Sequence, residues 1–254
     1  MSTLLALNFK NFFQQYAGEI FRIVEGQHFI VTRKLVDSDE EQRLLEDILD
    51  KSKPPAPMKN SHGALHYLLY TPFRYPPLKS GGRFHTRAEQ SIFYGAQELI
   101  TSMSEIAYHR FLFMQHSLAT FKPMQVPYTH FLAKVISMKS LLLTEIPFSA
   151  QHKKISDPSS YAYSQPLGTN MRKSGAQLFT YFSARKKHGI NVGLFSPEAF
   201  HFNKPSLGKE RHWIVYVDTD SIEFQRLDFK DNQKESHIFN IKDFYVDEVF
   251  PVIW

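Results

Sequence analysis

Residues 71–96 read TPFRYPPLKSGGRFHTRAEQSIFYGA, a stretch in which three arginines, a Gly-Gly pair and two tyrosines precede a predicted helix. Proline restricts its own backbone and that of the residue before it, so TPFRYPP predicts a stiff segment that holds an arginine with little entropy left to lose. Gly81 and Gly82 allow a turn that brings Arg83 back towards Arg74. Because arginine offers paired donors to anions, the stretch alone predicts an anion-binding site.

The composition of the chain predicts one globular domain with an extension. Of its 254 residues, 43% are hydrophobic and 15% aromatic, enough to bury a substantial core. The formal charge of +5 comes from 30 basic and 25 acidic residues mixed along the chain, which argues weakly for nucleic acid and more for a small anionic ligand. The absence of cysteine excludes disulfides and thiolate metal sites.

The N-terminal sequence MSTLLALNFKNFF lacks a basic segment followed by a long apolar run. The longest aliphatic stretch, 141–143, is too short to span a bilayer. We therefore expect no signal peptide, no membrane segment and a cytoplasmic location.

Two helices are predicted before the first proline-rich segment. Apolar residues recur every three or four positions over 8–25, the stripe of an amphipathic helix. Ser38 and Glu41 have the spacing of a capping box for a second helix near 39–51. The prolines of KSKPPAPMKN, residues 51–60, stop that helix.

The same proline-rich segment is the predicted boundary between an N-terminal helical extension, 1–58, and the main domain, 59–254. Within the main domain HYLLY and SIFYG are predicted strands, 97–116 is a predicted helix, and a helix near 160–174 ends at Gly175. The later predicted strands are FLAKVISM, AQLFTYF, NVGLF, HWIVYVDTDSIEFQRL with a hairpin turn at DTDS, and HIFNIKDFYV. Together these elements predict an α+β domain with mostly antiparallel strands.

Several common chemistry motifs are missing from the sequence, which has no GxGxxG opening a helix, no Walker A, no HExxH and no GxSxG. His62 and His66 have the spacing of two metal ligands on a helix, but no third ligand is nearby, so we expect no metal site. The basic cluster SARKKHG, 183–189, has no interleaved aromatics and is interpreted as a solvated loop rather than a nucleic-acid site.

Several segments together resemble a known family. TPFRYPPLKSGGRF, followed by SIFYGA and SEIAYHRF, resembles the core of the RES-domain family, bacterial toxins of toxin–antitoxin pairs named for arginine, glutamate and serine. FTYFSARKKHGINVGLF resembles the family's serine-containing strand and the asparagine-containing segment after it. The upstream IFRIVEG and the residues up to KPPAP resemble the leading region of one branch, so the resemblance spans roughly residues 20–200.

The resemblance implies an ADP-ribosyltransferase-like fold, with a mixed, mostly antiparallel split sheet and flanking helices. It also implies a toxin enzyme that cleaves the nicotinamide–ribose bond of NAD, as a glycohydrolase with water or a phosphorylase with inorganic phosphate, and that needs no cofactor. Such a bond breaks through an oxocarbenium-like state, and nicotinamide leaves as a neutral group, so one carboxylate can suffice where glycosidases use a pair. By the resemblance that carboxylate is Glu105, which stabilises the developing charge or orients a ribose hydroxyl and the acceptor.

The resemblance also assigns substrate contacts in the opening stretch. Arg74 and Arg83 supply bidentate donors for the pyrophosphate, or for the ribose and the nicotinamide amide. Tyr75 accompanies Arg74 in the matching FRYPP segment, and Tyr94 stands where a ring can stack on nicotinamide. His85 follows GGRF, where we expect asparagine or a small residue in many members, so the chain departs from the family pattern there.

Two further residues of the predicted site lie later in the chain. Ser183 matches the serine of the family name, and we expect it to hydrogen-bond the ligand rather than attack covalently, because no histidine–acid arrangement that would activate it is evident. Asn191 in GINVGLF is the remaining substrate-binding residue.

Two other functions remain open. ADP-ribosyl transfer onto a protein needs the same residues and only a different acceptor. A non-enzymatic protein that binds anions or nucleic acid would fit the net positive charge and the SARKKHG cluster. An NAD-degrading toxin implies a cognate Xre-type helix-turn-helix antitoxin that covers the active site, a homodimer within that complex, and no direct binding of nucleic acid or membrane.

Overall fold

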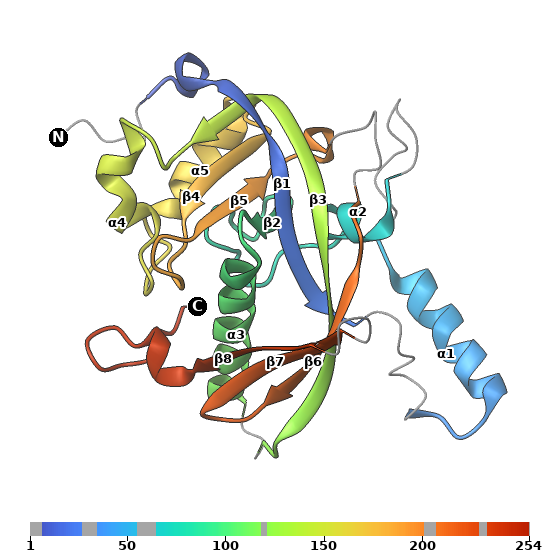
Figure 1. Ribbon diagram of the computed structural model, residues 1–254. Helices are drawn as coiled ribbons and strands as arrows, with labels where there is room; N and C mark the ends of the chain where they lie inside the picture. The colour runs from blue at the N-terminus through green and yellow to red at the C-terminus, as the bar shows by residue number, and fades with distance from the viewer. Residues whose placement is uncertain are drawn as a thin grey trace.

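The structure, a computed structural model, describes residues 7–26, 35–54, 65–117, 121–200, 207–228 and 233–253. Eight strands form one sheet, and helices pack against it (Figure 1). The strands are β1 (Gln14–Glu25), β2 (Phe93–Ala96), β3 (Met124–Leu142), β4 (Leu178–Phe182), β5 (Ile190–Leu194), β6 (Arg211–Val217), β7 (Ser221–Asp228) and β8 (Gln233–Asn240). The helices are α1 (Asp39–Ser52), α2 (Tyr67–Arg74), α3 (Leu99–His116), α4 (His152–Ile155) and α5 (Ser164–Lys173), with 3-10 turns η2 (Phe9–Phe12), η4 (Phe148–Gln151), η5 (Pro197–Ala199) and η6 (Ile241–Phe244).

The sheet divides at the long strand β3. The strand order is β1-β2-β5-β4-β3-β6-β7-β8, with an additional pairing of β1 to β3. Strand β6 pairs with the N-terminal part of β3 and leads into an arm of three strands, β6 to β8, whereas β4 pairs with the C-terminal end of β3. Every strand pair is antiparallel except β3–β4. The predicted α+β class with a mostly antiparallel split sheet is confirmed.

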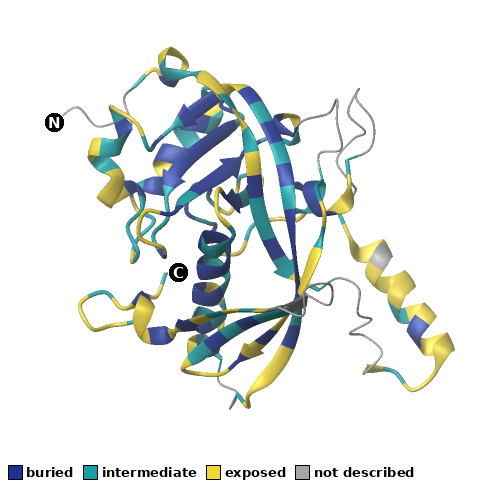
Figure 2. Ribbon diagram, viewed as in Figure 1, coloured by how far each residue is buried: buried dark blue, intermediate teal, exposed yellow. Residues whose placement is uncertain are grey.

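Helix α3 packs against the arm and is largely buried in its first turns (Figure 2). Its buried residues Met103 and Phe111 belong to one apolar cluster with Trp213 and Phe224 of the arm. Burying a side chain of this size contributes about 2 kcal/mol relative to leaving it exposed. This packing sets the position of α3 relative to the sheet, and so determines where the side chains on the other face of the helix lie.

The prediction of a helix over 8–25 is wrong. Only Phe9–Phe12 form a 3-10 turn, and Gln14–Glu25 form strand β1, which pairs with β3 along most of its length. Tyr16, Ile20 and Val24 are four residues apart, an even spacing that places them on one face of a strand as well as on one face of a helix, and pairing with β3 decides between the two. The sheet therefore includes residues on both sides of the predicted boundary after residue 58.

The prediction of a strand at HYLLY is also wrong, because Tyr67–Arg74 form helix α2. His66 caps the helix, since its Nδ1 accepts a hydrogen bond from the Leu68 amide at 3.4 Å, while His62 lies outside the described residues. Leu68, Leu69 and Phe73 are buried on one face of α2, a helical spacing that a short apolar run does not reveal.

Most other predicted elements are confirmed. Strand β2 overlaps SIFYG, α3 forms the helix predicted at 97–116 from residue 99 onward, and α5 ends before Gly175, whose φ is 89°. The hairpin turn at DTDS closes with a hydrogen bond from the Asp218 amide to the Ser221 carbonyl at 2.9 Å. No helix among the described residues is long and apolar enough to cross a membrane.

Helix α1 begins at the predicted capping box. The Ser38 hydroxyl accepts from the Glu41 amide at 3.2 Å, and the Glu41 carboxylate accepts from the Ser38 amide at 3.3 Å. The helix projects away from the sheet (Figure 1), and its apolar residues Leu44 and Ile48 are exposed. These two apolar side chains therefore lie in solvent rather than in the core.

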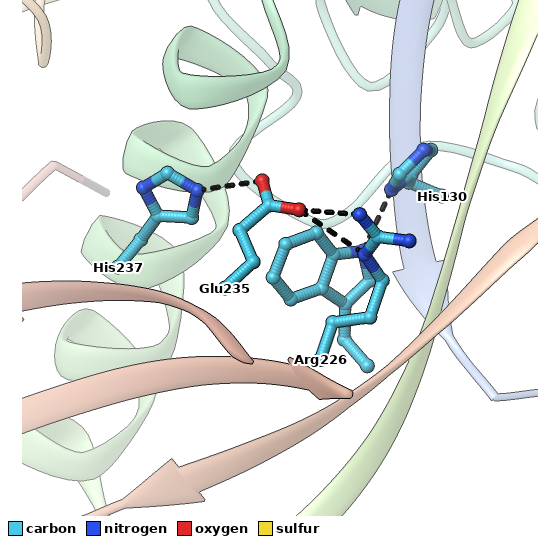
Figure 3. A network of polar contacts seen from close by, with 5 residues as sticks. His130, Arg226, Glu235 and His237 are labelled. Atoms are coloured by element: carbon cyan, nitrogen blue, oxygen red, sulfur yellow. Dashed lines mark hydrogen bonds and ion pairs between the residues drawn. The ribbon is translucent and has the colours of Figure 1, made fainter. Parts of the chain in front are cut away.

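A polar network joins the strands of the arm (Figure 3). Two nitrogens of Arg226 donate to one oxygen of Glu235 at 3.1 and 2.6 Å, and His237 lies 3.1 Å from the other oxygen. The Trp213 indole donates to His130 Nδ1 at 2.6 Å. The ion pair is partly exposed and contributes little to the free energy of unfolding. We therefore interpret the network as setting how β7 and β8 pair.

Candidate active site

A cavity of about 440 Å³ lies beside α3, and β1, β2 and the GGRFH turn also line it. Glu105 is the only acidic side chain among the described residues that line it. The basic and aromatic side chains around it are Arg22, Arg83, His85, Tyr94, Tyr108, His109, Tyr161, Tyr181 and Arg185. The cavity size is that of a small-molecule site, and its lining combines one carboxylate with arginines and tyrosines.

Two hydrogen bonds hold the carboxylate of Glu105. The Ser183 hydroxyl donates to Oε1 at 2.7 Å, and the Asn191 side-chain amide donates to the same oxygen at 2.6 Å. Ser183 follows β4 and Asn191 lies in β5, so two strands orient a side chain of α3. No described residue hydrogen-bonds to Oε2, which leaves that oxygen to face a ligand.

The hydroxyl of Ser183 is fully used within the protein. Its oxygen accepts from the main-chain amides of Arg185 and Lys186, each at 3.0 Å, while its proton is donated to Glu105. A hydroxyl in this arrangement positions the carboxylate rather than attacking, because the two main-chain amides occupy both lone pairs of its oxygen.

Two arginines of the cavity are anchored to the segment 155–161. Arg83 is buried, donates to the Asp157 carbonyl at 2.7 Å, and lies 4.8 Å from the centre of the Tyr161 ring. Arg185 donates to the Pro158 carbonyl at 2.9 Å and lies 3.3 Å from the centre of the Tyr108 ring. Neither guanidinium forms an ion pair with a described carboxylate. Their charge is therefore available to an anionic ligand.

A tight turn brings Arg83 and His85 to the cavity. Gly82 and His85 form an isolated antiparallel bridge, and Gly81 has a φ of 74°, which favours glycine. A side chain at Gly82 would meet the His85 ring at 2.3 Å. The turn therefore requires glycine at position 81, and Gly82 leaves room for the His85 ring, although the turn does not bring Arg83 to Arg74.

The remaining titratable groups of the cavity are neutral at pH 7. Burial lowers the pKa of His85 to about 4, with Arg172 adding to the shift and Glu89 opposing it. Burial also lowers the pKa of His109, and it raises the pKa values of Tyr94 and Tyr181. At neutral pH the cavity therefore carries the positive charges of its arginines and a single carboxylate.

The sequence model of the RES domain matches residues 59–218 of this chain. The chain belongs to the RES-domain family. Among solved structures it is similar to a chain in the crystal structure of the M. tuberculosis MbcT–MbcA toxin–antitoxin complex, with 11% identity and a TM-score of 0.46 over 85% of this chain and 92% of that one. No curated protein sequence matches it.

The structure brings most of the predicted RES-domain site residues together. Glu105, Arg83, His85, Tyr94 and Asn191 all line the cavity. The Tyr94 hydroxyl lies 3.5 Å from His85 Nδ1. The residues come from α3, the GGRF turn, β2 and β5, which the sheet and α3 hold side by side (Figure 1).

Arg74 and Tyr75 are not among the residues that line this cavity. Arg74 ends helix α2, where its Nε donates to the Pro54 carbonyl and its guanidinium lies 6.0 Å from the centre of the Tyr75 ring. The stretch TPFR is helical with Pro72 inside the helix, so the arginine is not carried by the stiff loop that was predicted.

Sequence reasoning missed several residues of the RES-domain cavity, among them Arg22, His109 and Arg185. Arg22 lies in IFRIVEG, which the resemblance included, but the predicted helix hid its place on β1. His109 follows Glu105 by four residues on the helix, a spacing that places both on one face. Arg185 belongs to SARKKHG, yet it is buried at 9% exposure, so the interpretation of this cluster as a solvated loop fails for it.

The stability of the protein is expected to fall as the pH is lowered from about 6.5 to 4. Burial lowers the pKa of both His85 and His130 to about 4. Between these pH values the unfolded chain binds protons that the folded chain does not, so the free energy of unfolding decreases, on the order of 3 kcal/mol per histidine. Urea denaturation at pH 7 and at pH 4.5 measures the loss.

The variant His85→Gln tests the assignment to that residue. It removes one of the buried histidines that titrate in this range, so the loss between pH 7 and pH 4.5 should shrink by the share of His85, while His109 and His130 supply the rest. An unchanged loss in this variant would contradict a buried, neutral His85.

Proposed function

We propose that this RES-domain protein is a toxin enzyme that cleaves the nicotinamide–ribose bond of NAD, with water or inorganic phosphate as acceptor. The observation that carries the proposal is Glu105, a lone carboxylate oriented by Ser183 and Asn191 in a cavity whose lining also includes three arginines and four tyrosines. A lone carboxylate suits a reaction that generates positive charge and needs no general acid.

The chemistry of NAD fits each part of the lining. Its nicotinamide ring is a planar cation, which favours contact with the faces of Tyr94, Tyr161 or Tyr181. Its pyrophosphate is an anion, which suits Arg22, Arg83 and Arg185. The neutral tyrosine hydroxyls can donate to ribose oxygens without adding charge to the site.

In the proposed reaction the C–N bond lengthens as the electron pair leaves with nicotinamide, and the anomeric carbon becomes positively charged. Oε2 of Glu105 faces that carbon or a ribose hydroxyl and stabilises the charge, while Ser183 and Asn191 keep the carboxylate from turning away. Water or phosphate then adds to the anomeric carbon, and a proton of the acceptor is released to solvent. Transfer to a protein side chain would use the same residues and differ only in that acceptor.

The purified protein, freed of any partner, should release nicotinamide from NAD. Chromatography of the products in phosphate buffer and in phosphate-free buffer measures the reaction and identifies the acceptor: ADP-ribose indicates water, and a phosphorylated ADP-ribose indicates phosphate. If NAD stays intact in both buffers, the proposed activity is wrong.

An enzyme that consumes NAD would harm its own cell. We therefore also propose a cognate antitoxin of the Xre helix-turn-helix type that covers the cavity, a cytoplasmic location, and a homodimer within the complex. The non-enzymatic nucleic-acid alternative loses Arg185, which is buried against Tyr108, and keeps only the exposed Lys186, Lys187 and His188 of the basic cluster.

A further inference from the structure

A second cavity of about 310 Å³ adjoins the first. Arg22, Ser91 and Ile92 line both cavities, so the two cavities are neighbours at these residues. The other side of the second cavity comes from α2 and the residue after it, through Tyr67, Leu68, Thr71, Pro72 and Tyr75. None of the functions considered for the first cavity uses this space.

The lining of the second cavity suits a flat, uncharged ring. Arg22 is the only charged residue among the described residues that line it. Tyr67 and Tyr75 are 38% and 39% exposed, so both residues stay partly accessible beside the cavity. The His66 ring lies 4.6 Å from the Tyr67 ring, and the Arg74 guanidinium lies 6.0 Å from the Tyr75 ring, centre to centre. Nucleobases stack on such rings with little dependence on their identity.

Arg22 lies where an anion would bridge the two cavities. Its Nη1 donates to the Tyr94 carbonyl at 2.6 Å, and its guanidinium lies 4.5 Å from the centre of the Phe93 ring. Its Nε is buried without a hydrogen-bond partner, and no carboxylate among the described residues forms an ion pair with it. Burial lowers the pKa of Arg22 to about 10, which still leaves it charged at pH 7. A desolvated cation without a counter-charge favours binding of an anion.

We propose that the second cavity binds the adenosine half of NAD, with the pyrophosphate at Arg22 and the nicotinamide riboside in the first cavity. The inference rests on the proposed function. The bond that breaks must lie near Glu105, which lines only the first cavity, so the nicotinamide riboside is placed there. Because the pyrophosphate joins the two nucleosides, the adenosine is then placed in the second cavity. Tyr75, which the sequence associated with substrate, then contacts the end of NAD that does not react.

The test compares NAD with nicotinamide mononucleotide, which has the same scissile bond but lacks the adenosine half. In Tyr75→Ala, kcat/KM for NAD should fall about tenfold, while kcat/KM for nicotinamide mononucleotide stays within about twofold of wild type. Tyr75→Phe keeps the ring and should behave as wild type with both substrates. Tyr216→Ala is the matched control, because Tyr216 is 40% exposed and lies on β6 away from both cavities.

A binding measurement separates this inference from the proposed activity. Calorimetric titration with adenosine monophosphate, which carries the adenosine and one phosphate, should give an affinity that Tyr75→Ala weakens about tenfold. If adenosine monophosphate binds in this way but NAD is not cleaved, the activity is wrong and the adenosine site stands. If Tyr75→Ala affects NAD and nicotinamide mononucleotide equally, affects neither, or leaves adenosine monophosphate binding unchanged, the adenosine site is wrong.

Discussion

Glu105→Gln is expected to lower kcat for NAD cleavage about 1,000-fold and to change KM little. Glutamine has the shape of glutamate and can still accept from Ser183 and Asn191, so the variant removes the negative charge and keeps the geometry. The charge acts chiefly on the oxocarbenium-like state, and the removal of one such electrostatic group at a reacting centre lowers kcat by about 100- to 1,000-fold. Initial rates of nicotinamide release over a range of NAD concentrations give both constants.

The matched control is Glu98→Gln, which removes the same charge from the exposed residue that precedes α3 and does not line the cavity. It should turn over NAD at the wild-type rate. Thermal unfolding of both variants, followed by circular dichroism, checks that neither is unfolded. A folded Glu105→Gln protein with a kcat within a few-fold of wild type would show that Glu105 is not the reacting carboxylate.

Several elements could be predicted because their signals are local. The capping box at Ser38 and the hairpin at DTDS need only nearby residues, and the structure contains both. The strand β1 could not be predicted in this way, because its apolar spacing fits a helix and its partner β3 lies about a hundred residues later in the chain. Whether such a segment forms a helix or a strand is therefore determined by its long-range pairing.

In the candidate site, too, some features could be predicted from the sequence and others depend on long-range contacts. Glu105 could be predicted from the family resemblance, but its two hydrogen bonds come from residues 78 and 86 positions away, which only the fold brings together. Arg22 and Arg185 were missed because an arginine in a sequence is by default a surface residue, and their burial results from tertiary packing. Arg74 was placed in a loop because Pro72 argues against a helix, yet the helix tolerates this proline two residues before its end.

Gly168→Ala is expected to destabilise the protein by about 3 kcal/mol and to reduce NAD cleavage as well. A Cβ at Gly168 of α5 would lie 2.0 Å from the Phe84 carbonyl oxygen and 2.5 Å from its carbon. These are backbone atoms, so either α5 must move away from the turn or the turn must shift. Phe84 lies between Arg83 and His85, and both of these line the cavity.

The control for this variant lies just beyond the same helix. Gly175→Ala adds the same methyl group where no atom lies within 4 Å, but at a φ of 89°, so it carries backbone strain without a clash and should cost about 1 kcal/mol. Urea denaturation measures both losses, and nicotinamide release should fall in Gly168→Ala alone. If the two variants are equally stable and equally active, close packing of α5 on the GGRF turn is not what positions Arg83 and His85. If Gly168→Ala loses stability but keeps full activity, the turn moves as a unit with its side chains and the cavity tolerates the shift.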